Sequence, residues 1–133
     1  MTSICFYFQV HQPFRIRHYS YVDIGSSTVY EDEIKNRESR NKVADKCYLR
    51  TNRKMLELIQ RYQGKFKISY SISGTAIEQF EKYRPDILQS FIDLANTGCV
   101  EFMAETYSHS LSFVFSKQEF VRQVKKHGQM IKK

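Results

Sequence analysis

Three short segments rich in β-branched and aromatic residues are separated by helical stretches, and this alternation limits the folds open to the chain. The segments are residues 4–11, 66–72 and 99–105. Each has the composition of a β-strand. Strands that alternate with helices are joined by right-handed crossovers and pair in parallel. The pattern therefore predicts an α/β fold with three parallel strands.

The segments between the strands carry helix signals of different strength. Residues 12 to about 40 are polar and irregular, which is typical of a long functional loop. We expect helices over residues 41–49, after Thr51, after the capping box Thr75–Glu78, over the stripe that Gly98 closes, and after the capping box Ser116–Glu119. The expected buried stripes are Met55, Leu58, Ile59 and Tyr62, then Leu88, Phe91, Ile92 and Ala95, then Phe120, Val124 and Ile131. The first of these ends at Gly64.

The length of the chain limits how complete this fold can be. Its 133 residues suit one domain. A closed β/α barrel needs roughly 250 residues, and three parallel strands cannot close one. We therefore expect residues 1–133 to form the three N-terminal β/α units of an incomplete barrel, with the missing C-terminal part of that barrel as a partner.

Each expected strand has one apolar face and one face with polar groups. The polar set is Cys5, Tyr7, Gln9, His11, then Lys67, Ser69, Ser71, Ser73, then Cys99, Glu101, Met103, Glu105. A parallel sheet covered on both faces would be apolar throughout, so polar inner faces indicate a site. An antiparallel sheet with one face in water is the alternative.

The carboxyl ends of the strands carry the candidate site residues. Ligands bind at this edge in parallel α/β folds. We predict a substrate-binding set made of His11, Gln12, Glu101, Glu105 and His109. The two histidines and two carboxylates are expected to converge there.

Four segments of the chain resemble glycoside hydrolase family 57, the α-amylase and 4-α-glucanotransferase family. Phe8-Gln-Val-His-Gln-Pro-Phe14 is similar to the first motif of that family, and Gly98-Cys-Val-Glu101 to the second. Lys65–Gly74 and Glu105–Leu111 are similar to the connecting segments of its α-amylase-like branch.

The resemblance implies a (β/α)7 barrel and retaining hydrolysis or transfer of α-glucosidic bonds in α-glucans. It maps His11 and Glu101 onto the sugar-binding wall, whereas Glu105 and His109 are added from their positions at the strand ends. The nucleophile glutamate and the acid/base aspartate of the family are expected beyond Lys133, so no catalytic residue is predicted here. The resemblance does not separate amylase, glucanotransferase, branching or α-galactosidase activity.

The spacing of Glu101 and Glu105 agrees with a binding role. Four strand residues separate them by about 13 Å, whereas retaining glycosidases hold their two carboxyls ~5–5.5 Å apart. We expect Glu101 to bind sugar hydroxyls or to orient His11. A buried charge satisfied by a neighbouring lysine or serine is the alternative.

Composition narrows the remaining functions. The net charge of +7 is scattered, which favours a solvated basic surface over nucleic-acid binding. Three distant cysteines, Cys5, Cys47 and Cys99, are expected to be buried and reduced. No apolar run suits a membrane span or a secretion signal, so a cytoplasmic location is expected.

We expect no metal and no cofactor, because the chain has neither an Asp-Asp pair after the first strand nor a His-x-x-x-His motif. The alternatives are a metal-dependent carbohydrate deacetylase or mannosidase-like barrel, and a non-catalytic carbohydrate-binding remnant.

Overall fold

The sheet is parallel and open. The computed structural model describes residues 4–132, in which β1 (Tyr7–Val10), β2 (Ile68–Ile72) and β3 (Val100–Phe102) lie in the order β1-β2-β3. Tyr7 pairs with Ser69, and Ile68 pairs with Val100. Both pairings are parallel, so the predicted α/β fold is confirmed and the antiparallel alternative is wrong. The open sheet with its helices is consistent with part of a β/α barrel.

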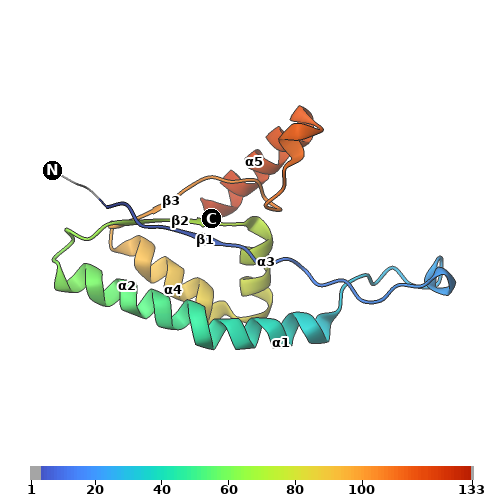
Figure 1. The fold of residues 1–133 in the computed structure, drawn as a ribbon, viewed down its shortest axis with the longest axis horizontal. Helices are drawn as coiled ribbons and strands as arrows, with labels where there is room; N and C mark the ends of the chain where they lie inside the picture. Colours follow the sequence, from blue (N-terminus) through green and yellow to red (C-terminus); the bar gives the residue numbers. More distant parts are fainter. Residues whose placement is uncertain (1–3, 133) are drawn as a thin grey trace.

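Helices cover one face of this sheet (Figure 1). The long helical segment consists of α1 (Glu33–Val43), a π-helical stretch (Ala44–Tyr48) and α2 (Leu49–Arg61). It is followed, after β2, by α3 (Gly74–Tyr83) and α4 (Pro85–Asn96). Helices α2 and α4 contact each other beneath the sheet. After β3, α5 (Lys117–Ile131) lies at the carboxyl end of β2 and contacts α3.

The core lies between the sheet and these helices. Tyr70 of β2 packs against Phe91 of α4 with ring centroids 5.5 Å apart, and against Phe8 of β1 at 5.3 Å. Phe80 of α3 is also fully buried. Burial raises the pKa of Tyr70 to about 12, because a phenolate would lose its hydration there. Such aromatic burial contributes, together with the aliphatic core residues, to the free energy that holds the sheet on its helices.

The helical segment begins earlier than the sequence predicts. Residues 33–40 were expected in the loop, but α1 starts at Glu33, and the Asp32 carboxylate accepts the Lys35 backbone N–H at 2.9 Å. The only buried residues of α1 are Asn36 and Arg40. A helix that buries polar side chains lacks the apolar stripe by which a helix is identified in a sequence.

The caps of the later helices are partly as predicted. Ser116 caps α5, as expected, by accepting the Glu119 N–H. Helix α3 is capped by Ser73, not by Thr75, because the strand ends directly before the helix and Ser73 accepts the Ala76 N–H. Gly98 lies at the C′ position of α4 with φ +67°, as the C′ rule expects. After α2 the C′ residue is Gln63, with φ +50°, and Gly64 follows it with φ +77°.

All three predicted stripes are wrong in part. Helix α4 buries Ile87, Phe91 and Leu94. The expected Leu88, Ile92 and Ala95 instead line an apolar groove of about 280 Å³ between α4 and the end of α5. Helix α5 buries Gln123 and His127, whereas Phe120 and Val124 are half-buried and Ile131 is exposed. In α2 the buried residues are Asn52 and Ile59, whereas the expected Met55 and Leu58 are half-buried and Tyr62, which follows the helix, is exposed.

The segment between β1 and α1 forms an arm that projects beyond the carboxyl end of the sheet (Figure 1). Its two sides are joined by an antiparallel bridge between Ile16 and Glu31. A short 3-10 helix at Tyr21–Asp23 lies at its tip, capped by Ser20. The expected irregular loop is therefore confirmed for residues 12–31 and is internally hydrogen-bonded.

The cysteines differ from the expectation of buried thiols. All three are free, but Cys5 and Cys47 are exposed and Cys99 is half-buried. Cys99 packs against the core, and its thiol donates to the Gly64 carbonyl at 3.6 Å. Its predicted place on the polar face of the sheet is thus wrong, because the chain turns at Gly98 before β3 begins. Among residues 4–132 no helix has the length and apolarity needed to cross a membrane.

Candidate functional site

The polar face of the sheet is hydrogen-bonded across its strands. The Tyr7 hydroxyl lies 2.6 Å from Ser71 Oγ, and His11 Nδ1 lies 2.8 Å from Ser73 Oγ. The first contact joins β1 to β2, and the second joins the residues that directly follow these two strands. Because strand residues alternate between faces, these side chains lie opposite the helix-covered core.

His11, His109 and Glu105 meet at the carboxyl ends of the strands. The imidazole centroids of His11 and His109 are 4.6 Å apart, and His109 Nδ1 lies 3.0 Å from Glu105 Oε2. The structure therefore brings together three of the five predicted site residues. His109 has φ +52°, a sparsely populated conformation for a residue with a side chain.

His109 Nδ1 has two competing partners. The Gln9 amide nitrogen lies 3.0 Å from it, the same distance as Glu105 Oε2. If Nδ1 carries a hydrogen it donates to Glu105, and if it is bare it accepts from Gln9. The position of the ring hydrogens of His109 thus decides whether Nδ1 bonds to the Glu105 carboxylate or to the Gln9 amide.

The surroundings of His11 favour its neutral form over the charged one. Partial burial lowers its pKa, the nearby His109 lowers it further, and Glu105 opposes the shift. Ser73 Oγ, its hydrogen-bond partner, also accepts the Ala76 N–H and lies 3.1 Å from Thr75 Oγ1. A neutral imidazole offers one donor and one acceptor, which suits a hydroxyl-bearing ligand.

Glu105 is mostly buried behind the histidines. Its side chain is 11% exposed, and Oε2 takes part in the contact with His109. The other oxygen, Oε1, is buried without a hydrogen-bond partner among the described residues. A buried acceptor of this kind is costly unless a donor reaches it.

The side chains of Glu101 and Gln12 form no hydrogen bond with this cluster within residues 4–132. Glu101 is exposed and pairs in register with Ser69, one strand residue before Phe102. No side-chain hydrogen bond or ion pair of the described chain involves Glu101, and the contacts of the His11 ring are with Ser73 and His109. Glu101 therefore does not orient His11 here, and the alternative of a buried, satisfied charge is wrong. Gln12 is 7% exposed, and its carbonyl accepts from Gln79 Nε2 at 2.7 Å.

Several residues that support the cluster were not predicted. Gln123 and His127 of α5 bond to the segment that carries Glu105 and His109. Tyr107 is buried against Gly74, where a side-chain methyl would overlap its ring. Their sequence signal was weak, because a glutamine and a histidine within an otherwise basic helix look like surface residues.

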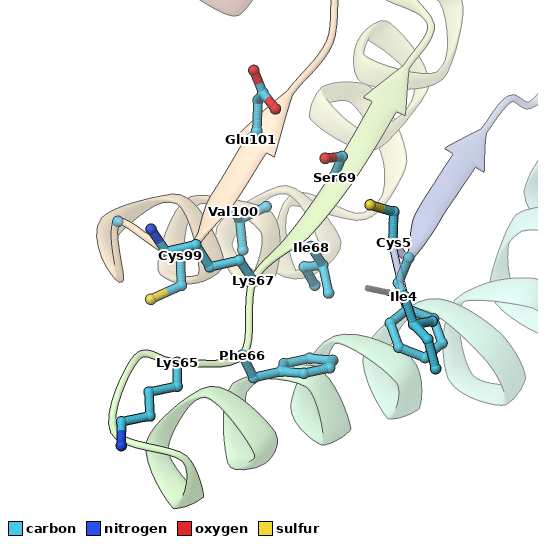
Figure 2. A pocket seen from close by; sticks show the side chains of 12 residues that line it. Ile4, Cys5, Lys65, Phe66, Lys67, Ile68, Ser69, Cys99, Val100 and Glu101 are labelled. Carbon is cyan, nitrogen blue, oxygen red and sulfur yellow. The ribbon is translucent and has the colours of Figure 1, made fainter. Parts of the chain in front are cut away.

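A second concave region lies at the opposite, amino end of the sheet. It has a volume of about 540 Å³, and Figure 2 shows Cys5, Lys65, Lys67, Cys99 and Glu101 around it. Glu101 thus borders this pocket rather than the histidine cluster. Within residues 4–132 no group of three or more histidine, cysteine, aspartate or glutamate side chains is arranged to hold a metal ion.

Comparisons with known proteins agree with the motifs and the sheet. The model of glycosyl hydrolase family 57 matches residues 5–133. A protein of Methanocaldococcus jannaschii named "Putative alpha-amylase" is 42% identical over 133 residues, which cover 97% of this chain and 28% of that protein. The chain thus spans less than a third of its relative's length.

A solved structure has a similar fold. The 4-alpha-glucanotransferase from Thermococcus litoralis superposes with a TM-score of 0.61 at 19% identity, over 96% of this chain and 17% of that one. At this identity the likeness concerns the fold. The family assignment follows from the match of the family model across nearly the whole chain: the chain belongs to glycosyl hydrolase family 57.

Proposed function

We propose that this chain forms part of the glucan-binding wall of an enzyme that hydrolyses or transfers α-glucosidic bonds with retention. The observation that carries the proposal is the cluster of His11, His109 and Glu105 at the carboxyl ends of parallel strands. That edge is where α/β folds bind ligands. The family match and the names of the two relatives support an α-glucan or maltooligosaccharide as the substrate.

In this proposal the residues bind sugar hydroxyls rather than break the bond. Neutral His11 donates to or accepts from a hydroxyl, and His109, which is partly exposed, offers its free ring edge. Glu105 orients the ring of His109 through their contact at 3.0 Å. Exposed Glu101 binds a hydroxyl further along the polar face, and Gln12 holds the turn after β1 through its carbonyl.

The nucleophile and the acid/base are proposed to come from outside these residues. Glycoside hydrolysis with retention needs two free carboxyls ~5–5.5 Å apart across the bond. Glu105 is engaged with His109 and mostly buried, whereas Glu101 is exposed and borders the pocket at the amino end of the sheet. We therefore propose that this chain by itself cleaves no glucan.

The alternatives are less well supported. A metal-dependent deacetylase or mannosidase needs a ligand set, and the described residues offer no group of three suitable side chains. A non-catalytic binding remnant would share the same wall, so only activity separates it from the main proposal. Exposed free thiols are compatible with a reducing compartment, and we propose a cytoplasmic location on that basis.

Replacement of His11 tests the binding role. We expect His11→Ala to lower turnover of maltooligosaccharides by the full-length enzyme ~10²-fold, provided that the contact strengthens in the transition state. Glu101→Gln is expected to do similar damage without unfolding the protein. His18→Ala, on the exposed arm, is the matched control and should leave turnover unchanged. Wild-type kinetics in His11→Ala would contradict the assignment, and starch hydrolysis by the 133-residue chain would contradict its catalytic incompleteness.

A further inference from the structure

Helix α5 buries polar side chains, whereas a helix that covers a sheet ordinarily buries apolar ones. Its two buried residues are Gln123, 6% exposed, and His127, 1% exposed. They are four residues apart and so lie on one face of the helix. Burying polar groups is unfavourable unless each finds hydrogen-bond partners, so the partners show what this face is for.

His127 bonds to the ends of two strands at once. Its Nε2 lies 2.8 Å from the Ile72 carbonyl, and the Glu105 N–H points to its Nδ1 at 3.5 Å. A carbonyl accepts and an N–H donates, so these contacts require a hydrogen on Nε2 and a bare Nδ1. His127 therefore bridges the last residue of β2 and Glu105, the residue that contacts His109.

Gln123 holds the segment that follows. Its Oε1 accepts the Ser108 N–H at 3.1 Å and the Ser110 hydroxyl at 3.0 Å. Its Nε2 donates to Glu119 Oε1 at 2.9 Å, which fixes the orientation of the amide. Ser108 and Ser110 flank His109, whose backbone has φ +52°. Gln123 thus bonds on both sides of a strained residue.

We propose that Gln123 and His127 are positioning residues that hold Glu105 and His109 against His11. Each of their contacts involves a residue next to or within the cluster. Ile72 precedes Ser73, the hydrogen-bond partner of His11. Glu105 contacts His109, and the two serines are its neighbours in the chain. Apolar residues could fill the same space but could form none of these bonds. The inference deepens the proposed sugar-binding function, which it assumes only for its last readout.

The decisive measurement is the proximity of the two imidazoles, followed by NMR in the protein with labelled histidines. In the wild type we expect a nuclear Overhauser effect between the ring protons of His11 and His109, and a nitrogen spectrum of His127 with hydrogen on Nε2 alone. His127→Leu should abolish the His11–His109 effect. His127→Gln, which keeps a donor and an acceptor, should retain it.

Two controls separate positioning from general destabilisation. Val124→Ala shortens a half-buried side chain on the same helix, so it should lower the melting temperature while leaving the imidazole contact intact. Gln123→Met, of similar size but unable to bond the loop, should weaken the contact. If His127→Leu does not fold, the comparison of Gln123→Met with Val124→Ala still tests the proposal.

Sugar binding supplies the final readout. If the proposed function holds, Gln123→Met should weaken maltotriose binding about tenfold, as loss of one hydrogen bond would. The positioning role is overturned if the imidazole contact survives in both His127→Leu and Gln123→Met, or if His127 carries its hydrogen on Nδ1. If the contact behaves as expected but the wild type binds no maltooligosaccharide, the sugar-binding function fails and the positioning role stands.

Discussion

Helices α4 and α5 each pack against the parallel sheet, yet they bury opposite kinds of side chain. Helix α4 buries Ile87, Phe91 and Leu94 in the core, and α5 buries Gln123 and His127 at the carboxyl end of β2. The first helix contributes to stability through apolar area, and the second through directed bonds to a loop. A helix beside a site can thus bury fewer apolar side chains and use polar ones to fix the positions of site residues.

The largest effect is expected in the apolar helix. Phe91→Ala should lower the free energy of unfolding by about 3–5 kcal/mol, because the ring is 3% exposed and packs on Tyr70 and Phe80. Denaturant unfolding measures it. Ile92→Ala, one residue along and exposed, should change little. Equal losses in both variants would break the contrast between the faces of α4.

An intermediate effect is expected where α3 meets the site loop. Gly74→Ala should cost about 1–3 kcal/mol, because the new methyl overlaps the ring of Tyr107 and the ring must move. Gly128→Ala in α5 is the matched control, because nothing lies near its missing Cβ. There the substitution should stabilise the protein by roughly 0.5–1 kcal/mol through helix propensity. Thermal melts of both variants should therefore shift in opposite directions.

The smallest effect concerns the protonation of His11, whose ring contacts His109 in the loop that α5 holds. The pKa of His11 lies below its ordinary value of 6.5, so between the two values the unfolded chain binds more protons than the folded one. His11 therefore reduces stability as the pH falls below 6.5 and through the folded pKa, and leaves it unchanged at higher pH.

The two neighbours of His11 should act on it with opposite signs. His109→Ala removes a repelling charge and should raise the His11 pKa, whereas Glu105→Gln removes an attracting charge and should lower it. An NMR titration of His11 in the three proteins measures both. Shifts in the same direction would show that movement of the loop, not charge, controls His11.

The strands and their pairing could be read from the sequence, because both depend on short-range patterns. Alternation in residues 66–72 and the glycines that end the preceding helices are local, and helices between strands leave parallel pairing as the remaining arrangement. The site edge followed from the same rule. His11, Glu105 and His109 stand at strand ends, and the structure brings them together.

Tertiary structure alone decided which of the predicted residues face each other and which helices serve the core. The sequence places Glu101 and Glu105 on one predicted strand, but β3 ends at Phe102, so Glu101 lies in the strand beside the amino-end pocket and Glu105 lies in the following loop beside the histidines. The roles of Gln123 and His127 exist only once the loop folds back onto α5. A periodic pattern records how apolar a face is, whereas a buried hydrogen bond depends on a partner that is distant in sequence, such as Ile72 for His127.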